Sequence, residues 1–234
     1  SMETKKTLLF NTNPQPGVAD LNHQHALFIG LIAGEQKQFY TNSLTTGANQ
    51  KLLDSLLSDK AKIKEPLQIQ SIFNFLKEEG ERSAYNIMIP LFLSIKGKEK
   101  REAAIQERFI GIERLVQYCR NLNNFLQYIQ FHSTLRITNE DLQRGILAWD
   151  LSKMIILARI AYDYQLINEK EAWEYIEFAD KKCRECFTSW EEVGKSYLLG
   201  QVINYPGEDE FKKVIGYYCS AMKDVKSPWI NTPF

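Results

Sequence analysis

Apolar residues recur every three or four positions along most of the chain, which is the spacing of amphipathic α-helices. The pattern runs from 67 to 76 after Pro66, a residue that the first turn of a helix tolerates, and Gly80 is placed to end that helix. The same spacing from 102 to 131 predicts one long helix with a buried stripe. No run of alternating β-branched residues is bounded by turn residues, so the pattern predicts no sheet.

Two segments are apolar on nearly all sides. Residues 140–165 leave almost no polar face around Ile155 and Ile156, and such a helix belongs in the middle of a bundle. Residues 84–95 contain Pro90, which predicts either a kink or two short helices.

The C-terminal half also carries helix-start signals, in which a capping side chain precedes an acidic residue by three positions. These pairs are Thr138 with Asp141, Asn168 with Glu171 and Thr188 with Glu191.

These elements predict an all-α fold, a single compact orthogonal helical bundle of about eight helices. Residues 1–17 lack periodicity and are rich in turn formers, so we expect an irregular N-terminal arm that begins with expression-tag residues Ser1-Met2. The first helix is expected near Val18, and residues 18–234 are expected to form one all-helical domain.

Charge and composition narrow the possible partners. The 234 residues include 29 basic and 29 acidic ones, so the formal net charge is zero and no overall field attracts nucleic acid or an anionic membrane. The strongest apolar run, 26–33, is far shorter than the roughly twenty residues of a membrane-spanning helix. No secretory signal is visible, so we expect a cytoplasmic protein whose four cysteines are free thiols.

Asp150 and Arg159 are the charges that most need an explanation. Nine positions separate them, which places them on opposite sides of one apolar helix, so each needs its own partner. One reading is a structural network in which Asp150 caps a neighbouring helix or holds an arginine. The other is a polar pocket in which Asp150, Arg159 and Glu171, with Tyr197, bind a ligand or act as acid and base.

The remaining reactive side chains predict no cofactor and no metal. Cys183 and Cys186 have the two-residue gap of zinc and redox sites, but further ligands and the expected fold context are missing. His23 and His25 follow Asp20, yet residues two apart point to different sides of a helix. The tryptophans are expected to anchor the core, with Trp229 free to fold back and close the bundle.

Several of these motifs resemble the bacterial domain of unknown function 1266 family. They are Gly145-Ile-Leu-Ala-Trp-Asp-Leu151, Leu157-Ala-Arg-Ile-Ala-Tyr162, Glu171-Ala-Trp173, Phe187-Thr-Ser-Trp-Glu-Glu192 and Ser196-Tyr-Leu-Leu-Gly200. The resemblance is most specific over 145–205 and extends to an upstream helix at 67–82 and to Ser227-Pro-Trp229. The family pattern usually has arginine in place of Lys153 and histidine in place of Glu81. An arginine clamp would be weakened by Lys153, because lysine is only a point charge.

The resemblance implies a fold and a set of candidate binding residues rather than an activity. These are Trp149, Asp150, Lys153, Arg159, Glu171, Trp190 and Tyr197. Without a catalytic constellation the sequence favours a non-enzymatic, protein-binding module, most concretely an immunity or antitoxin-like protein that neutralises a partner toxin or effector. The mixed-charge segments 96–114 and 168–192 are the expected interface. The alternative is an enzyme or small-ligand binder built on the polar pocket.

Overall fold

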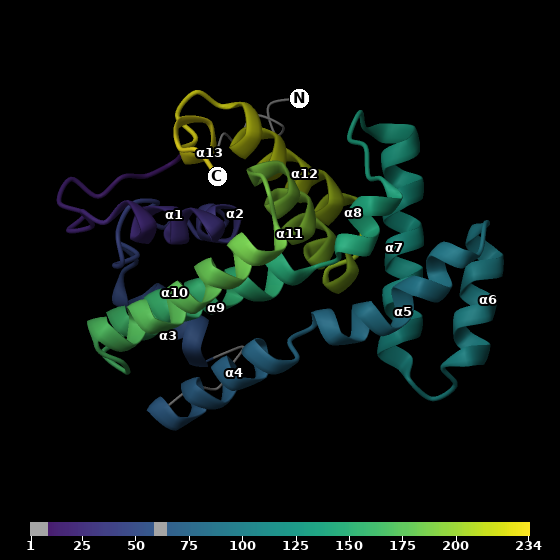
Figure 1. Ribbon diagram of the computed structural model, residues 1–234, viewed down its shortest axis with the longest axis horizontal. Helices are drawn as coiled ribbons and strands as arrows, with labels where there is room; N and C mark the ends of the chain where they lie inside the picture. The colour runs from purple at the N-terminus through teal and green to yellow at the C-terminus, as the bar shows by residue number, and fades with distance from the viewer. Residues whose placement is uncertain (1–8, 59–64) are drawn as a thin grey trace.

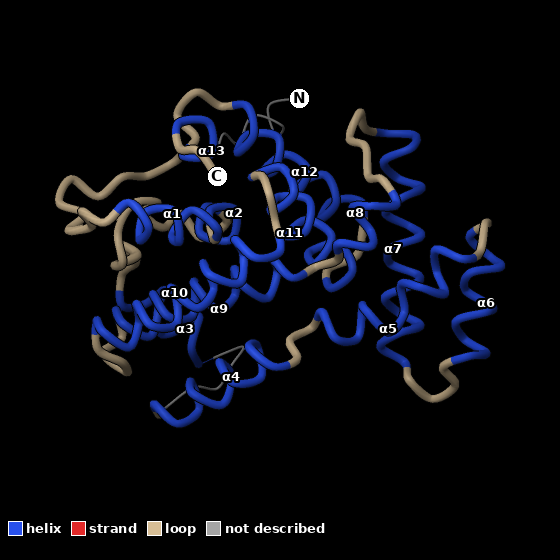
Figure 2. Tube along the Cα trace, in the orientation of Figure 1, coloured by secondary structure: helices blue, strands red, loops and turns tan. Residues whose placement is uncertain are grey.

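The computed structural model describes residues 9–58 and 65–234, and these ranges form thirteen helical segments without a strand (Figures 1 and 2). The all-α prediction is confirmed, with more helices than the expected eight or so. They are α1 (Leu21–Ile29), α2 (Leu31–Glu35), α3 (Gln50–Ser58), α4 (Pro66–Glu78), α5 (Arg82–Ser94), α6 (Lys98–Arg108), α7 (Glu113–His132), α8 (Asn139–Arg144), α9 (Leu147–Asp163), α10 (Glu169–Cys186), α11 (Trp190–Asn204), α12 (Glu208–Lys223) and α13 (Pro228–Asn231).

Helix α9 lies at the centre of the molecule, as its sequence predicts. Thirteen of its seventeen residues are buried. It packs against α10 and α11, and also against α1, α2, α4 and α5 (Figure 1). Its contact with α11 is close because residue 200 is glycine, and a Cβ atom there would overlap Trp149. The apolar circumference of α9 therefore follows from neighbours on every side.

The buried apolar side chains form one continuous cluster that reaches from Phe10 to Trp229. Trp229 is 6% exposed, stacks on Trp190 and donates its indole N–H to the carbonyl of Phe28 at 2.8 Å. The C-terminal tryptophan thus folds back onto the bundle as expected. The described part of the N-terminal arm, 9–17, has no helix, and Phe10 is buried in the cluster.

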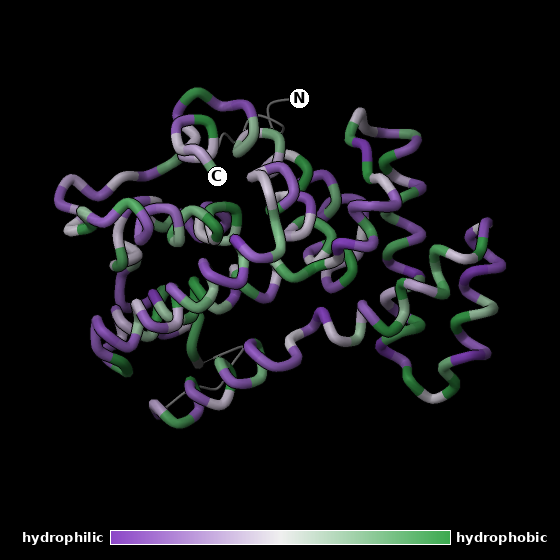
Figure 3. The backbone as a smooth tube through the Cα atoms, viewed as in Figure 1, coloured by the Kyte–Doolittle hydropathy of each residue, from purple (hydrophilic) through white to green (hydrophobic). Residues whose placement is uncertain are grey.

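The predicted long helix over 102–131 is wrong, because the chain breaks into α6 and α7 at residues 109–112. Gly111 has φ +84°, a left-handed conformation that ends the helix and reverses the chain. The apolar residues 109, 110 and 112 continue the helical spacing in the sequence, yet they lie in the loop. Figure 3 colours this loop largely hydrophobic. A similar break at Gly145, with φ +83°, divides the predicted 140–165 helix into α8 and α9.

Helix starts agree with the sequence to within a few residues. The capping boxes of Thr138 with Asp141 and of Asn168 with Glu171 are both formed. The third is shifted by one position, because Ser189 rather than Thr188 caps α11. The first helix begins at Leu21 rather than near Val18. Asp20 caps this helix, and its side chain accepts from the N–H of Asn22.

Two further expectations concern the effect of Pro90 and the presence of a membrane-spanning helix. Pro90 lies inside α5, which continues past it as one helix, so neither of the two short helices is formed. Within residues 9–58 and 65–234, no helix is both long and apolar enough to cross a bilayer.

Candidate functional site

Asp150 lies at the start of α9 with no exposed surface, and three donors satisfy its carboxylate. The backbone N–H groups of Glu81 and Arg82 donate to its two oxygens at 2.9 and 3.0 Å, and the Arg82 guanidinium donates at 3.0 Å. Asp150 therefore caps the first turn of α5 and also holds an arginine. Burial raises the pKa of Asp150, and these donors act in the opposite direction.

Arg82 connects Asp150 to the end of α4. Its guanidinium donates at 2.7 Å to the carbonyls of Leu76 and of Lys77, which the last turn of a helix leaves without partners. Gly80 closes the junction with φ +59°, and a Cβ atom there would overlap the Asp150 carboxylate. One carboxylate thus fixes the turn between α4 and α5 onto α9.

Glu81 forms the partly exposed edge of this cluster. Its carboxylate accepts from the Trp149 indole N–H at 2.7 Å and pairs with Lys153 at 2.6 Å. The Lys153 ammonium also lies 4.8 Å from the centre of the Trp149 ring, within range of a cation–π contact. Glu81 and Lys153, for which the resemblance implies a departure from the family pattern, contact each other.

Arg159 has different partners, on the other side of α9. It is 2% exposed and donates to the carbonyls of Tyr40 at 2.6 Å and of Leu44 and Thr45 at 3.2 Å. Burial lowers the pKa of Arg159 to about 10, and the nearby Asp163 acts to raise it. The guanidinium therefore fastens the loop between α2 and α3 to the central helix.

The other predicted residues are divided among separate places. Tyr197 is buried beside Trp149, with ring centres 5.2 Å apart, and its hydroxyl donates to Gln36 at 2.7 Å. Glu171 is exposed and completes the capping box of α10. Trp190 is 5% exposed near the C-terminal segment. The structure thus brings together Trp149, Asp150, Lys153 and Tyr197, and gives Arg159, Glu171 and Trp190 other neighbours.

The comparisons with known proteins return one family. The model of the family described as "Protein of unknown function (DUF1266)" matches residues 56–234, which is more than half of the chain. The chain belongs to the DUF1266 family. Neither the curated proteins nor the solved structures contain a match. The matched range includes α4, α5 and α9, so the whole Asp150 cluster of this DUF1266 chain lies within the family region.

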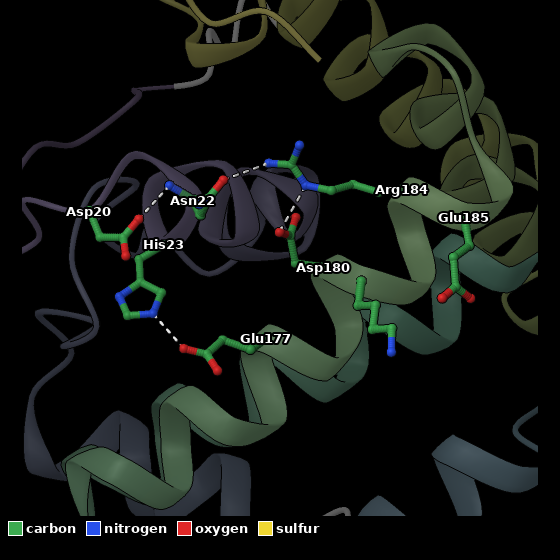
Figure 4. A pocket seen from close by; sticks show the side chains of 8 residues that line it. Asp20, Asn22, His23, Glu177, Asp180, Arg184 and Glu185 are labelled. Atoms are coloured by element: carbon green, nitrogen blue, oxygen red, sulfur yellow. Dashed lines mark hydrogen bonds and ion pairs between the residues drawn. The ribbon is translucent and has the colours of Figure 1, made fainter.

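A groove of about 550 Å³ between α1 and α10 gathers charged side chains that the sequence did not bring together (Figure 4). His23 stacks on Trp173, with ring centres 4.0 Å apart, and pairs with Glu177 at 2.7 Å. On the same wall, Arg184 pairs with Asp180 at 3.0 Å. Figure 4 shows the His23–Glu177 pair joining α1 to α10, with the Arg184–Asp180 pair further along α10.

His25 is buried behind this groove, and the sequence suggested only a possible metal ligand at this position. It is 3% exposed, and its Nδ1 lies 2.6 Å from Asp180. His23 and His25 point to different parts of α10, as their spacing requires, but both meet acids there. The signal in the sequence was the three-residue gap between Glu177 and Asp180, which places both acids on one face of a helix.

No group of three or more histidine, cysteine or acidic side chains in residues 9–58 and 65–234 is arranged to hold a metal ion. Cys183 and Cys186 are both free. Burial raises the pKa of the Cys183 thiol, which makes it a packing residue, whereas Cys186 is exposed.

Proposed function

We propose that this DUF1266 protein is a protein-binding module whose contact surface is centred on the loop between α6 and α7, residues 109–112. One observation carries the proposal: Ile110 is 81% exposed and Ile112 is 50% exposed, on either side of Gly111 in one turn. Isolated exposed apolar residues are ordinary, but apolar side chains gathered at one projecting point are typical of interaction sites. This loop lies within segment 96–114, for which the sequence predicted an interface.

The architecture presents this loop to solvent. Helix α6 packs mainly on α5 and α7, away from the centre at α9 (Figure 1). Gly111 reverses the chain between α6 and α7, so the isoleucines on either side of it stand at the end of a helical hairpin. Transfer of a fully exposed isoleucine into an apolar pocket contributes about 1.5–3 kcal/mol, enough to anchor a contact.

The charges around the loop indicate a protein rather than a membrane or a nucleic acid. Glu107 and Arg108 precede it, Glu113 and Arg114 follow it, and all four are exposed. Their charges cancel, so no local field favours an anionic surface. We therefore assign the loop a partner with an apolar cleft whose rim carries charges of both signs.

The narrower form of the proposal is that the partner is a toxin or effector that this protein neutralises in the cytoplasm. It is carried by the sequence argument alone, namely a neutral helical protein without a catalytic constellation. The rival ligand pocket is not put forward, because Asp150, Arg159 and Glu171 have separate partners and none of the described hollows is lined by both Asp150 and Arg159.

Photo-crosslinking in the native host tests the broad proposal. The cross-linkable residue p-benzoylphenylalanine is placed at Ile110, with Gln130 as the control, because that exposed residue lies at the opposite end of α7. We expect a discrete adduct of one mass from position 110 and not from position 130. Equal labelling from both positions, or no adduct, would contradict a contact surface at this loop.

The narrower proposal has its own test. Each product of the neighbouring genes is expressed alone and together with this protein, and cell growth is measured. We expect one product to arrest growth, with rescue by the wild-type chain and loss of rescue by Ile110→Asp but not by Gln130→Asp. If position 110 gives an adduct but no neighbouring product arrests growth, the proposal of a protein-binding module stands and the proposal of a toxin partner fails.

A further inference from the structure

His25 has one ring nitrogen that is fixed and another without a partner. A carboxylate oxygen only accepts, so the Nδ1 that faces Asp180 donates and the Nε2 of a neutral ring presents a lone pair. Nε2 is buried, and no group in the described part of the chain bonds to it. An unpaired buried polar atom is destabilising, so the unpartnered Nε2 points to a hydrogen-bond donor that binds there.

The orientation of His25 is set by its surroundings. Asp180 is 8% exposed, and its second oxygen accepts from the Arg184 guanidinium at 3.0 Å (Figure 4). The imidazole therefore cannot turn away without breaking a buried, charge-assisted hydrogen bond. A side chain held in this way is preorganised to bind a ligand.

Two aromatic rings pack against the imidazole. The ring of Trp190 lies 4.8 Å from that of His25 and the ring of Phe234 lies 5.2 Å from it. The two nitrogens of an imidazole point to different sides, so Nε2 faces away from Asp180. Trp190 and Phe234 also line a hollow of about 520 Å³ on the protein surface. These two rings therefore separate His25 from that hollow.

The segment that carries Phe234 is lightly attached. From Thr232 to Phe234, one hydrogen bond joins it to the rest of the described chain, from the Trp190 indole N–H to the Thr232 carbonyl at 2.8 Å. Ile230, just before it, is 50% exposed. Displacement of the Phe234 ring would uncover the His25 imidazole beside Trp190.

We propose that His25, Trp190 and the slot under Phe234 form a binding site for a small planar molecule that carries a neutral hydrogen-bond donor, such as a phenolic hydroxyl or an indole N–H. The ligand ring takes the place of Phe234, and its donor bonds to Nε2. The aromatic rings of Trp190 and Phe234 around the slot disfavour a charged ligand. This site lies apart from the α6–α7 loop and does not depend on the proposed protein contact.

Phenol and anisole test the site, because they have similar shapes and only phenol carries a donor. Binding is followed by NMR through the side-chain nitrogens of ¹⁵N-labelled histidine. We expect phenol to shift the Nε2 resonance of His25 in a saturable way, with anisole about tenfold weaker, the worth of one hydrogen bond. Phe234→Ala should bind phenol more tightly, because the covering ring is gone.

His25→Asn separates the site from the fold. The asparagine amide N–H₂ can still donate to Asp180, but it has no counterpart of Nε2, so the variant should fold and bind phenol about tenfold less tightly. His23→Asn is the matched control and should bind phenol as wild type does. The Phe234→Ala variant decides the matter even if His25→Asn does not fold: equal binding of phenol and anisole, or an unmoved Nε2 resonance, overturns the proposal.

Discussion

Asp150 and His25 are both buried polar side chains that join helices far apart in the sequence, and they differ in how completely they are bonded. The Asp150 carboxylate receives three N–H groups from the start of α5. His25 is bonded through Nδ1 alone, and its Nε2 has no partner among the described residues. Helix packing alone explains the first arrangement. The second leaves an unsatisfied atom that packing does not explain.

The difference shows where function is to be sought in this molecule. A sequence motif with an acid and tryptophans resembles an active site, yet its charged groups form the hydrogen bonds and ion pairs that join α4, α5 and α9. The histidine has no comparable motif around it, but its bonding is incomplete in a way that a ligand can complete. Satisfaction of hydrogen bonds, rather than the presence of charged residues, separates the two sites.

The largest expected effect comes from Asp150→Ala. The change leaves the Arg82 guanidinium and two backbone N–H groups without their acceptor, so the free energy of unfolding should fall by about 3–5 kcal/mol. Urea denaturation monitored by circular dichroism measures it. Glu171→Ala is the control, because it removes an exposed capping carboxylate, and its loss should be clearly smaller. Equal losses of unfolding free energy in the two variants would contradict the fully hydrogen-bonded Asp150 carboxylate that the geometry indicates.

A second test disturbs the same cluster without removing a charge. Gly80→Ala introduces a Cβ atom at φ +59°, where it overlaps the Asp150 carboxylate. The strained backbone alone should cost about 1–3 kcal/mol. Gly216→Ala is matched, because a Cβ atom there meets nothing within 4 Å and Gly216 lies inside α12 with no positive φ. Gly216→Ala should stabilise the protein by about 0.5–1 kcal/mol. If both variants were destabilised, the loss at Gly80 would reflect a general intolerance of glycine substitution rather than the close contact with Asp150.

The pH dependence of stability extends the comparison to two other buried acids. Burial raises the pKa of Glu35 above 4.5, and the N–H groups of Phe10 and Leu9 act in the opposite direction; its Oε1 has no partner in the described chain. Burial would also raise the pKa of Asp141, but bonds from Thr138 and Arg144 and the charge of Lys195 leave it below 3.8.

The two acids should act with opposite signs. The contribution of Glu35 is complete below about pH 4.5 and is lost as the pH rises through its raised pKa, so Glu35→Gln should flatten the fall in unfolding free energy above that pH. The contribution of Asp141 is present above about pH 3.8 and is lost as the pH falls through its lowered pKa. Asp141→Asn should therefore flatten the fall in unfolding free energy below that pH. Urea titrations across this pH range would contradict the assignment if either slope were unchanged.

The smallest effect on stability is expected at the α6–α7 loop. Ile110→Ser removes an apolar side chain that is 81% exposed, so the free energy of unfolding should change by no more than about 0.5 kcal/mol. The same urea denaturation measures it. A larger loss would show that Ile110 supports the fold and would remove the main observation behind the proposed contact surface.

Much of the helical architecture could be predicted from local patterns. The capping boxes at Thr138 and Asn168 and the start of α4 at Pro66 depend on residues three or four apart, which the sequence displays directly. The breaks at Gly111 and Gly145 were missed, since the apolar spacing continues through them. A glycine inside a periodic segment does not reveal whether its φ is positive.

By itself, the sequence determined that the fold is helical, that α9 is central and that Asp150 and Arg159 have separate partners, because helical periodicity and rotation per residue are local properties. The tertiary structure alone decided which partners they have. Arg82 reaches Asp150 across 68 positions, and Asp180 reaches His25 across 155. Contacts of that range arise from the packing of whole helices, and only there does a buried polar side chain become either fully bonded or available to a ligand.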